Sequence, residues 1–216
     1  GLKISKYDSR RKSNLSVLLE DTPLSYYWIG FIMADGCFTG PLLSQLGITL
    51  QTIDEEHVKS FAKFINTENI SNFTNQLGKK YTQCKVQDKF ISPQICNKFD
   101  INRAKTYNPP KRLSTNNIKL LFPLLIGLID GDGCIFKKSN RNLIHITIKC
   151  HSSWMDFYSL LDKILFDNTN SITINSKGYM EYRICKKNNT EKLYQISSKL
   201  TTLKRKWDKF IPYIHI

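Results

Sequence analysis

Hydrophobic and polar residues follow two patterns along the chain, and both recur in the same order in each half. An apolar stretch that ends in an acid, at 23–35 and again at 123–132, predicts a buried helix. Strict alternation of apolar and polar residues at 45–51 and at 143–149 predicts half-buried strands. Because the order is repeated, we expect two structurally similar halves.

The remaining segments of the two halves also correspond. The first half is predicted to continue with a helix capped by Asp54, strands near 71–77 and 81–87, and a short helix at 92–99. The second half is predicted to continue with a helix at 153–166, strands near 171–175 and 179–185, and a helix near 190–200. Both halves follow the order helix, two strands, helix, two strands, helix. The predicted fold class is α+β, with two pseudo-symmetric αββαββα repeats.

Composition shifts mark the predicted boundaries of these repeats. We place the first repeat at 22–112 and the second at 120–216, joined by a Ser-, Thr- and Asn-rich linker at 113–119. Residues 1–21 lack a clear period and are interpreted as a basic arm, which either lies on a polyanion or is simply solvated. Its basic residues are Lys3, Lys6, Arg10, Arg11 and Lys12.

The two apolar stretches contain near-copies of one short segment, WIGFIMADG at 28–36 and LIGLIDGDG at 125–133. Small residues four positions apart lie on one face of a helix and leave that face almost bare. Two such faces are expected to pack backbone against backbone. The small residues are Gly30 and Ala34 in the first copy, and Gly127 and Gly131 in the second.

Proline and glycine indicate where these helices begin and end. Pro23 and Pro123, each with the residue before it, are expected starts, and the glycine after each acid is expected to end the helix. Asp35 and Asp132 would then emerge side by side, as two carboxylates must do to share divalent ions. The alternative is a pair of buried helices whose acids only cap turns.

The repeated segment resembles the signature of the LAGLIDADG homing endonucleases, and the two copies indicate a single-chain, two-repeat member. The resemblance implies central LAGLIDADG helices and curved antiparallel sheets that form a DNA-binding saddle. It also implies Mg²⁺, with Mn²⁺ able to substitute and Ca²⁺ supporting binding without cleavage. Met33 stands where the second copy has Asp130, which argues against a metal role for Asp130. The implied ligands are two acids and two main-chain carbonyls: Asp35, Asp132, Ala34 and Gly131.

The resemblance further implies one basic residue per repeat near the active site. The matching positions are Lys105 in INRAKT and Lys206 in LKRKW, where two neighbouring basic residues compete for the alignment. A lysine there would polarise the attacking water or stabilise the charge on the phosphate. Alternatively, either lysine is an ordinary phosphate anchor. Gln51 and Lys149, at the helix-facing ends of the second strands, are predicted to organise water near the metals.

Strand alternation predicts which side chains face away from the core. The outward positions carry amide, hydroxyl and basic groups, the types that pair with base edges in the major groove. Any half-exposed sheet also has a polar outer face, so the pattern gains weight only from the paired acids. The predicted DNA-binding residues are Gln45, Thr49, Gln51, Gln83, Lys85 and Gln87 in the first repeat, and His145, Thr147, Lys149, Thr173, Asn175, Glu181 and Arg183 in the second.

Composition agrees with a polyanionic partner. The chain has 32 basic and 18 acidic residues and a net charge of +14, which attracts phosphates at long range. Ribosomal, membrane-surface and heparin-binding proteins share this property. Six cysteines without zinc-ligand spacing are typical of a reducing intracellular compartment. No uncharged apolar stretch is long enough to predict a membrane span.

The sequence therefore predicts a metal-dependent endodeoxyribonuclease, encoded by a mobile intron or an intein, that hydrolyses both strands of a long double-stranded target. Because the predicted outward faces of the two repeats differ, the target should be asymmetric and a monomer should suffice. Two alternatives remain open on the same fold. One is an RNA maturase that assists intron splicing, and the other is a catalytically silent DNA-binding regulator, which the presence of both acids disfavours.

Overall fold

The computed structural model describes residues 13–137 and 143–213, so the basic residues of the predicted arm lie outside the described residues. The first half contains α2 (Pro23–Ala34), β1 (Gly36–Thr39), β2 (Gln45–Gln51), α3 (Glu55–Phe64), β3 (Ile70–Thr74), β4 (Lys80–Gln87) and α4 (Ile91–Phe99). The second half contains α5 (Ile118–Asp132), β5 (Gly133–Lys137), β6 (Ile144–His151), α6 (Met155–Phe166), β7 (Ser171–Ile174), β8 (Tyr179–Ile184), α7 (Lys187–Ser197) and α8 (Lys204–Trp207). The predicted α+β fold of two similar halves is confirmed.

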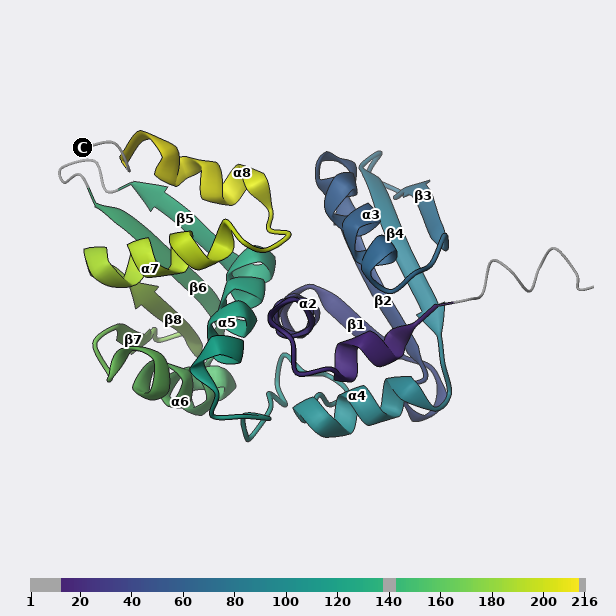
Figure 1. Cartoon of the computed structure of the whole chain (residues 1–216), viewed down its shortest axis with the longest axis horizontal. Helices are drawn as coiled ribbons and strands as arrows, with labels where there is room; N and C mark the ends of the chain where they lie inside the picture. The colour runs from purple at the N-terminus through teal and green to yellow at the C-terminus, as the bar shows by residue number, and fades with distance from the viewer. Residues whose placement is uncertain (1–12, 138–142, 214–216) are drawn as a thin grey trace, which may run out of the picture.

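Each half forms one antiparallel four-stranded sheet, with strand order β1-β2-β4-β3 in the first and β5-β6-β8-β7 in the second. The registers also correspond, since Gly36 pairs with Ile48 and Gly133 pairs with Ile148. α2 and α5 lie side by side at the centre of the molecule, with one sheet on either side of them (Figure 1). The helix pair therefore joins the two halves of the molecule.

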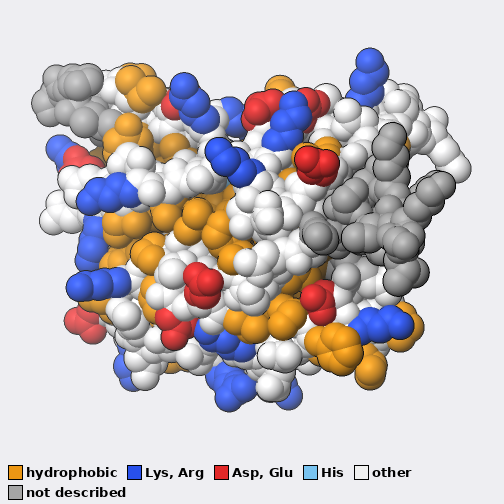
Figure 2. Space-filling view, turned by 45° about the vertical axis from the view of Figure 1, so that its right-hand side comes forward, with side chains coloured by type: hydrophobic (Ala, Val, Ile, Leu, Met, Phe, Trp, Pro, Cys, Tyr) orange, Lys and Arg blue, Asp and Glu red, His pale blue; other side chains and the backbone are white. Residues whose placement is uncertain are grey.

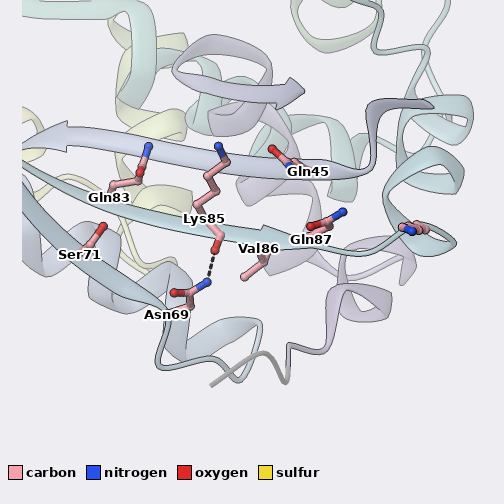
Figure 3. A pocket seen from close by; sticks show the side chains of 8 residues that line it. Gln45, Asn69, Ser71, Gln83, Lys85, Val86 and Gln87 are labelled. Atoms are coloured by element: carbon pink, nitrogen blue, oxygen red, sulfur yellow. Dashed lines mark hydrogen bonds between the residues drawn. The ribbon is translucent and has the colours of Figure 1, made fainter. Parts of the chain in front are cut away.

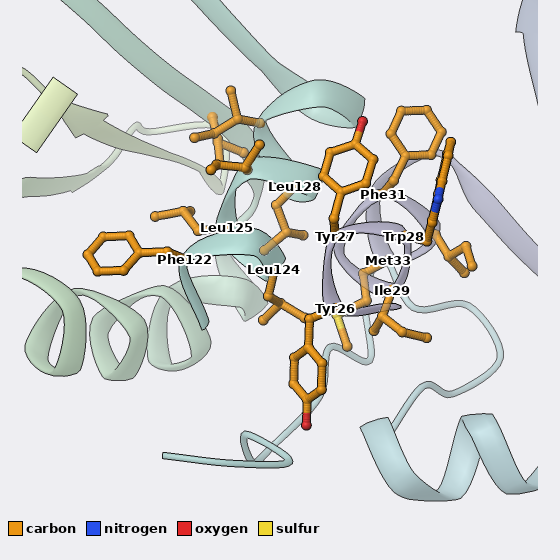
Figure 4. Packing of buried hydrophobic residues seen from close by; sticks show 14 of the residues in the cluster. Tyr26, Tyr27, Trp28, Ile29, Phe31, Met33, Phe122, Leu124, Leu125 and Leu128 are labelled. Carbon is orange, nitrogen blue, oxygen red and sulfur yellow. The ribbon is translucent and has the colours of Figure 1, made fainter. Parts of the chain in front are cut away.

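The two central helices pack backbone against backbone, as the small residues predict. A Cβ placed on Gly127 would lie 2.0 Å from the Tyr27 carbonyl oxygen, and one on Gly30 would lie 2.0 Å from that of Leu124. Side chains on the other faces of the pair point outward into the two cores, with Trp28 toward the first sheet and Phe122 toward the second (Figure 4). Only residues without a side chain fit at these crossing points.

The start of the second central helix differs from its predicted position. α5 begins at Ile118, and the Asn117 side chain accepts a hydrogen bond from the Lys119 N–H at 3.0 Å. Asparagine caps helices well, so a full turn forms before Pro123, which lies inside the helix. In the first half Thr22 caps α2 ahead of Pro23, as expected.

Two further differences concern the helix ends and the predicted arm. The glycine after each acid does stand where the helix ends, but Gly133 has a φ of −86° and so needs no left-handed conformation. Its Cβ would lie 2.6 Å from the Ile129 carbonyl oxygen, so close approach of the chain explains the glycine. Part of the predicted arm belongs to the core, because the 3₁₀ helix Leu15–Leu19 buries Leu15 and Leu18.

The structure also has elements that alternation does not predict. α8 and the 3₁₀ helix Asp208–Tyr213 follow the last predicted helix, and their buried residues include Trp207 and Phe210. Asp54 precedes α3 as expected, but its side chain makes no capping hydrogen bond and binds Arg205 of α8 instead. Helix α8 of the second half thus contacts the first half.

Gly127→Ala should destabilise the protein by roughly 1 to 3 kcal/mol or more, because the added methyl group overlaps the backbone of α2. Gly47→Ala is the matched control, since its Cβ would lie 3.4 Å from the Cys37 sulfur, an ordinary contact. Urea unfolding of both variants measures the difference. Equal stability of the two variants would show that the helices do not meet at Gly127.

His57 gives a second prediction, on the pH dependence of stability. Its ring is 5% exposed and packs against Trp28 and Phe31, with ring centroids 4.8 and 4.7 Å apart. Burial lowers the pKa of His57 from 6.5 to about 4. Between these two pH values His57 binds a proton in the unfolded chain but not in the folded one. The free energy of unfolding therefore falls as the pH drops from about 6.5 to 4. His57→Gln should flatten this part of the unfolding free energy curve, and parallel curves for both proteins would contradict the assignment.

Candidate active site

Asp35 and Asp132 stand at the ends of α2 and α5, beyond the close crossing at Gly30 and Gly127. A Cβ on Gly131 would lie 2.2 Å from the Ala34 Cβ and 3.3 Å from the Asp35 nitrogen, which places the two helix ends in direct contact. Both carboxylates keep solvent contact. Burial by the surrounding protein raises the pKa of Asp132, and the nearby charge of Asp35 raises it further. The two acids are therefore close enough to act on one another.

Each central helix ends in a cage of carbonyl oxygens that holds a lysine. Lys105, in the loop after α4, donates through Nζ to the carbonyls of Met33, at 2.7 Å, and Ala34. Lys206, on α8, is 7% exposed. Its Nζ shares its three N–H donors among the carbonyls of Ile129, Asp130, Gly131 and Gly133, at 3.0, 2.5, 3.1 and 2.8 Å.

This arrangement makes Lys105 and Lys206 structural equivalents, although Lys105 lies in a loop and Lys206 on a helix. A cation at the carboxyl end of a helix is stabilised by the exposed carbonyls and the helix dipole. Burial lowers the pKa of both lysines, whereas the charges of Asp35 and Asp132 oppose that effect. Each ammonium group is therefore fixed beside the acids by its own half of the molecule.

The donor set at the helix ends suits a hard divalent cation. Carboxylate and carbonyl oxygens are the groups that Mg²⁺ and Ca²⁺ bind. Within the described residues, no group of three or more His, Cys, Asp or Glu side chains is placed to hold a metal ion. Two carboxylates alone leave several positions for water and phosphate oxygens, which is how Mg²⁺ usually binds with a phosphate substrate. The carbonyls of Ala34 and Gly131 already accept lysine hydrogen bonds, so their metal role stays a prediction.

Asp130 faces the interior. Its carboxylate is fully buried and accepts hydrogen bonds from the Tyr27 hydroxyl, at 2.7 Å, the Leu203 N–H, at 2.9 Å, and the Trp207 indole, at 2.7 Å. Burial raises its pKa to about 6 in spite of these donors. Asp130 thus anchors the segment around α8 to α5, and in the first half the apolar Met33 takes its place.

The equal registers show which residues correspond at the ends of the second strands. Gln51 pairs with Tyr81 and His151 pairs with Tyr179, so the counterpart of Gln51 is His151. Lys149 corresponds to Thr49 instead, two pairs farther from the end. Sequence alternation could not reveal this correspondence, because it depends on how β2 pairs with β4 and how β6 pairs with β8. His151 therefore joins Gln51 as a candidate near the acids.

The outer face of the first sheet carries most of its predicted residues together. Gln83 donates to the Thr49 hydroxyl at 2.8 Å, and Gln45 pairs directly with Gln87. Figure 3 shows Gln45, Gln83 and Lys85 on one side of the sheet and Val86 on the other. They line a groove of about 680 Å³, to which Asn69 and Ser71 also contribute. Asn69, absent from the predicted set, bonds the Lys85 carbonyl through its side chain.

The outer face of the second sheet is more highly charged. Glu181 lies between Lys149, whose Nζ is 3.1 Å from its carboxylate, and Arg183, which donates to it. These two hydrogen bonds, opposed by partial burial, lower the pKa of Glu181. The three side chains form a charged row, with Thr173 paired across from Glu181.

Three predicted residues of the second sheet are placed differently from expectation. Alternation predicts that His145 and Thr147 face outward, but they are only 9% and 5% exposed. Phe136 covers His145 from the neighbouring strand, with ring centroids 5.7 Å apart. The Asn175 side chain accepts hydrogen bonds from the main chain at 177 and 179 and so closes the β7–β8 turn. These residues are less available to a ligand than alternation suggests.

Lys and Arg side chains are spread over the face in Figure 2, with Asp and Glu side chains between them. Among the described residues, no helix has the length and apolar character required to cross a bilayer.

Known proteins resemble this chain in part of its sequence and over most of its fold. Residues 120–197 match the model of a LAGLIDADG-like domain, while a search of curated protein sequences gives no match. The fold is similar to that of the homing endonuclease I-WcaI (TM-score 0.61, 13% identity, covering 95% of this chain and 93% of that one). It is also similar to a mutant of I-SmaMI (TM-score 0.58, 12% identity, covering 90% of this chain and 92% of that one). A third similar structure is the LAGLIDADG meganuclease I-AabMI (TM-score 0.52, 14% identity, covering 87% of each chain).

The resemblance predicted from the two sequence copies is thus confirmed. The chain has the two-repeat fold of the LAGLIDADG homing endonucleases and carries a LAGLIDADG-like domain in its second half.

Proposed function

We propose that this protein is a site-specific, metal-dependent DNA endonuclease that acts as a monomer and cuts one strand with each half. The observation that carries the proposal is the junction of α2 and α5, where two acids and two caged lysines meet between two polar sheet faces. A single chain thus holds both copies of every group that cutting two strands requires.

Each group has a chemical task at this junction. Bound divalent ions would activate water and neutralise charge on the phosphate and the leaving oxygen. Asp35 and Asp132 would hold the ions, and Lys105 and Lys206 would stabilise the negative charge that builds up on the phosphate. Because the lysines are bonded to the helix ends, their positions are set before DNA arrives.

The solved structures of similar fold support DNA as the partner. I-WcaI is bound to its DNA recognition sequence and I-AabMI to uncleaved DNA. I-SmaMI is bound to an uncleaved DNA target in the presence of calcium ions. A Mg²⁺ requirement, with Mn²⁺ as a substitute and Ca²⁺ supporting binding only, agrees with the oxygen donors at the helix ends.

The two sheet faces favour an asymmetric target. The first face is rich in amides, which pair with adenine, whereas the second carries the row Lys149, Glu181 and Arg183, whose basic members prefer guanine. Different base preferences in the two half-sites follow, and a second copy of the chain is unnecessary. Retention of both acids favours an enzyme over a silent DNA-binding regulator.

The test is to incubate the protein with a randomised DNA library and Mg²⁺ and to sequence the cut ends. Asp35→Asn and Asp132→Asn should abolish double-strand cutting of the recovered target but keep binding in Ca²⁺, because the charge is needed chiefly for the ions. Asp156→Asn, at an exposed position on α6, is the matched control and should cut normally. Full cutting by either active-site variant would refute the shared-metal site.

Arg183→Ala should weaken binding by roughly 1 to 3 kcal/mol at one guanine-containing base pair and relax selectivity there. Glu181→Gln should reduce selectivity at the same base pair, because Glu181 accepts the hydrogen bond that orients Arg183. Binding to a panel of single-base variants of the target measures both effects. A uniform loss across the panel would mean that Arg183 contacts phosphate instead.

A further inference from the structure

One ion pair joins the two halves beside the proposed active site. The guanidinium of Arg205 donates through Nε and Nη2 to the two carboxylate oxygens of Asp54, both at 2.7 Å. Arg205 lies on α8 of the second half, next to Lys206, and Asp54 ends the 3₁₀ helix Thr52–Asp54 of the first. The charges of both residues influence the pKa of Asp35, which places the pair near the acids.

The geometry of this pair is well suited to fixing a segment. A two-pronged contact between guanidinium and carboxylate restrains direction as well as distance. The Asp54 side chain is 10% exposed and that of Arg205 is 52% exposed. The carboxylate is therefore held within the first half, and the guanidinium of the second half contacts it at the surface. Because Arg205 is half-exposed, the contact should add little to overall stability.

α8 is otherwise held from the inside alone. Asp130 accepts hydrogen bonds from the Leu203 N–H and the Trp207 indole, on either side of Lys206. Toward the first half, α8 borders a groove of about 280 Å³ lined by residues of both halves, among them Ile53, His57, Thr202 and Leu203. Within the described part of the chain, the ion pair that crosses this groove is Arg205 with Asp54.

The loop that carries Lys105 also crosses to the opposite half, but through uncharged contacts. Ser153 donates to the Thr106 carbonyl at 3.2 Å, and the rings of Tyr107 and His151 meet edge to face at 4.9 Å. Each lysine is thus held by its own helix end, and the segment that carries it also contacts the other half. The two crossings differ in chemistry, so they can be disrupted separately.

We propose that Arg205 and Asp54 are positioning residues, which fix Lys206 against the end of α5 from the opposite half and so control the cutting of one DNA strand. The inference rests on the proposed endonuclease function. Losing the pair leaves α8 attached through Asp130 but free to tilt into the groove. Lys206 then loses its fixed place beside Asp132, while Lys105 keeps its own.

The first experiment measures the cutting rate of each strand separately, on the target recovered from the library. Lys206→Met and Lys105→Met identify the strand that depends on each lysine. Arg205→Ala should slow the Lys206-dependent strand by roughly ten-fold or more relative to the other, as removal of a supporting partner commonly does. Arg205→Lys should restore part of the ratio. Lys204→Ala, which removes an exposed charge from the same helix and leaves the pair intact, should not change it.

The second experiment does not depend on cutting. Reductive methylation of the free protein, followed by mass spectrometry, measures how fast each lysine reacts. Lys206 should react roughly ten-fold faster in Arg205→Ala and in Asp54→Asn than in the unaltered protein, because its Nζ leaves the carbonyl cage. Lys105 should react at its original rate in both variants.

The outcomes separate the two proposals. Equal slowing of both strands by Arg205→Ala, or unchanged labelling of Lys206, would overturn the positioning role. Absence of any cutting by the unaltered protein would contradict the endonuclease function, while the labelling result would still decide whether the pair fixes Lys206. Melting temperatures of the variants, expected to change little, show that the effects do not come from unfolding.

Discussion

The contact between the backbones of α2 and α5 is the constraint on which the rest of the structure depends. Gly30 and Gly127 bring the two helices so close that a methyl group on either would overlap the main chain of the other. Close approach along the helices fixes the relative placement of their ends, and with it the distance between Asp35 and Asp132. Each helix also forms one wall of a sheet core, so the same contact sets how the two halves face one another.

Bringing two helix ends together concentrates negative charge. Both helix dipoles have their negative ends here, beside two carboxylates. These groups repel one another, which would be unfavourable without cations. Lys105 and Lys206 supply part of the compensation by filling the carbonyl positions. Burial nevertheless raises the pKa of both acids, although the two lysines lower it. Divalent ions, which the proposed function requires, would add positive charge where burial opposes the ionised form of the two carboxylates.

The two halves are alike in topology and different in chemistry. Met33 stands in the first half where the second has Asp130, the buried carboxylate that anchors the segment around α8. One crossing between the halves is a charged pair and the other is not. Different side chains on the two outer faces complete the asymmetry. A single chain can vary each half independently, which a symmetric dimer cannot do.

Local patterns in the sequence determined the repeated order of elements, the bare helix faces and the two acids, because periodicity and small-residue spacing are properties of neighbouring positions. Tertiary structure decided what depends on distant partners. Asn117 moved the start of α5 ahead of Pro123, and Phe136 covered His145 in spite of its outward register. The resemblance predicted Lys206 near the acids, but only the fold gave its contacts with the carbonyls of α5 and the contact of Arg205 with Asp54, since hydrogen bonds between residues far apart in sequence leave no periodic signal along the chain.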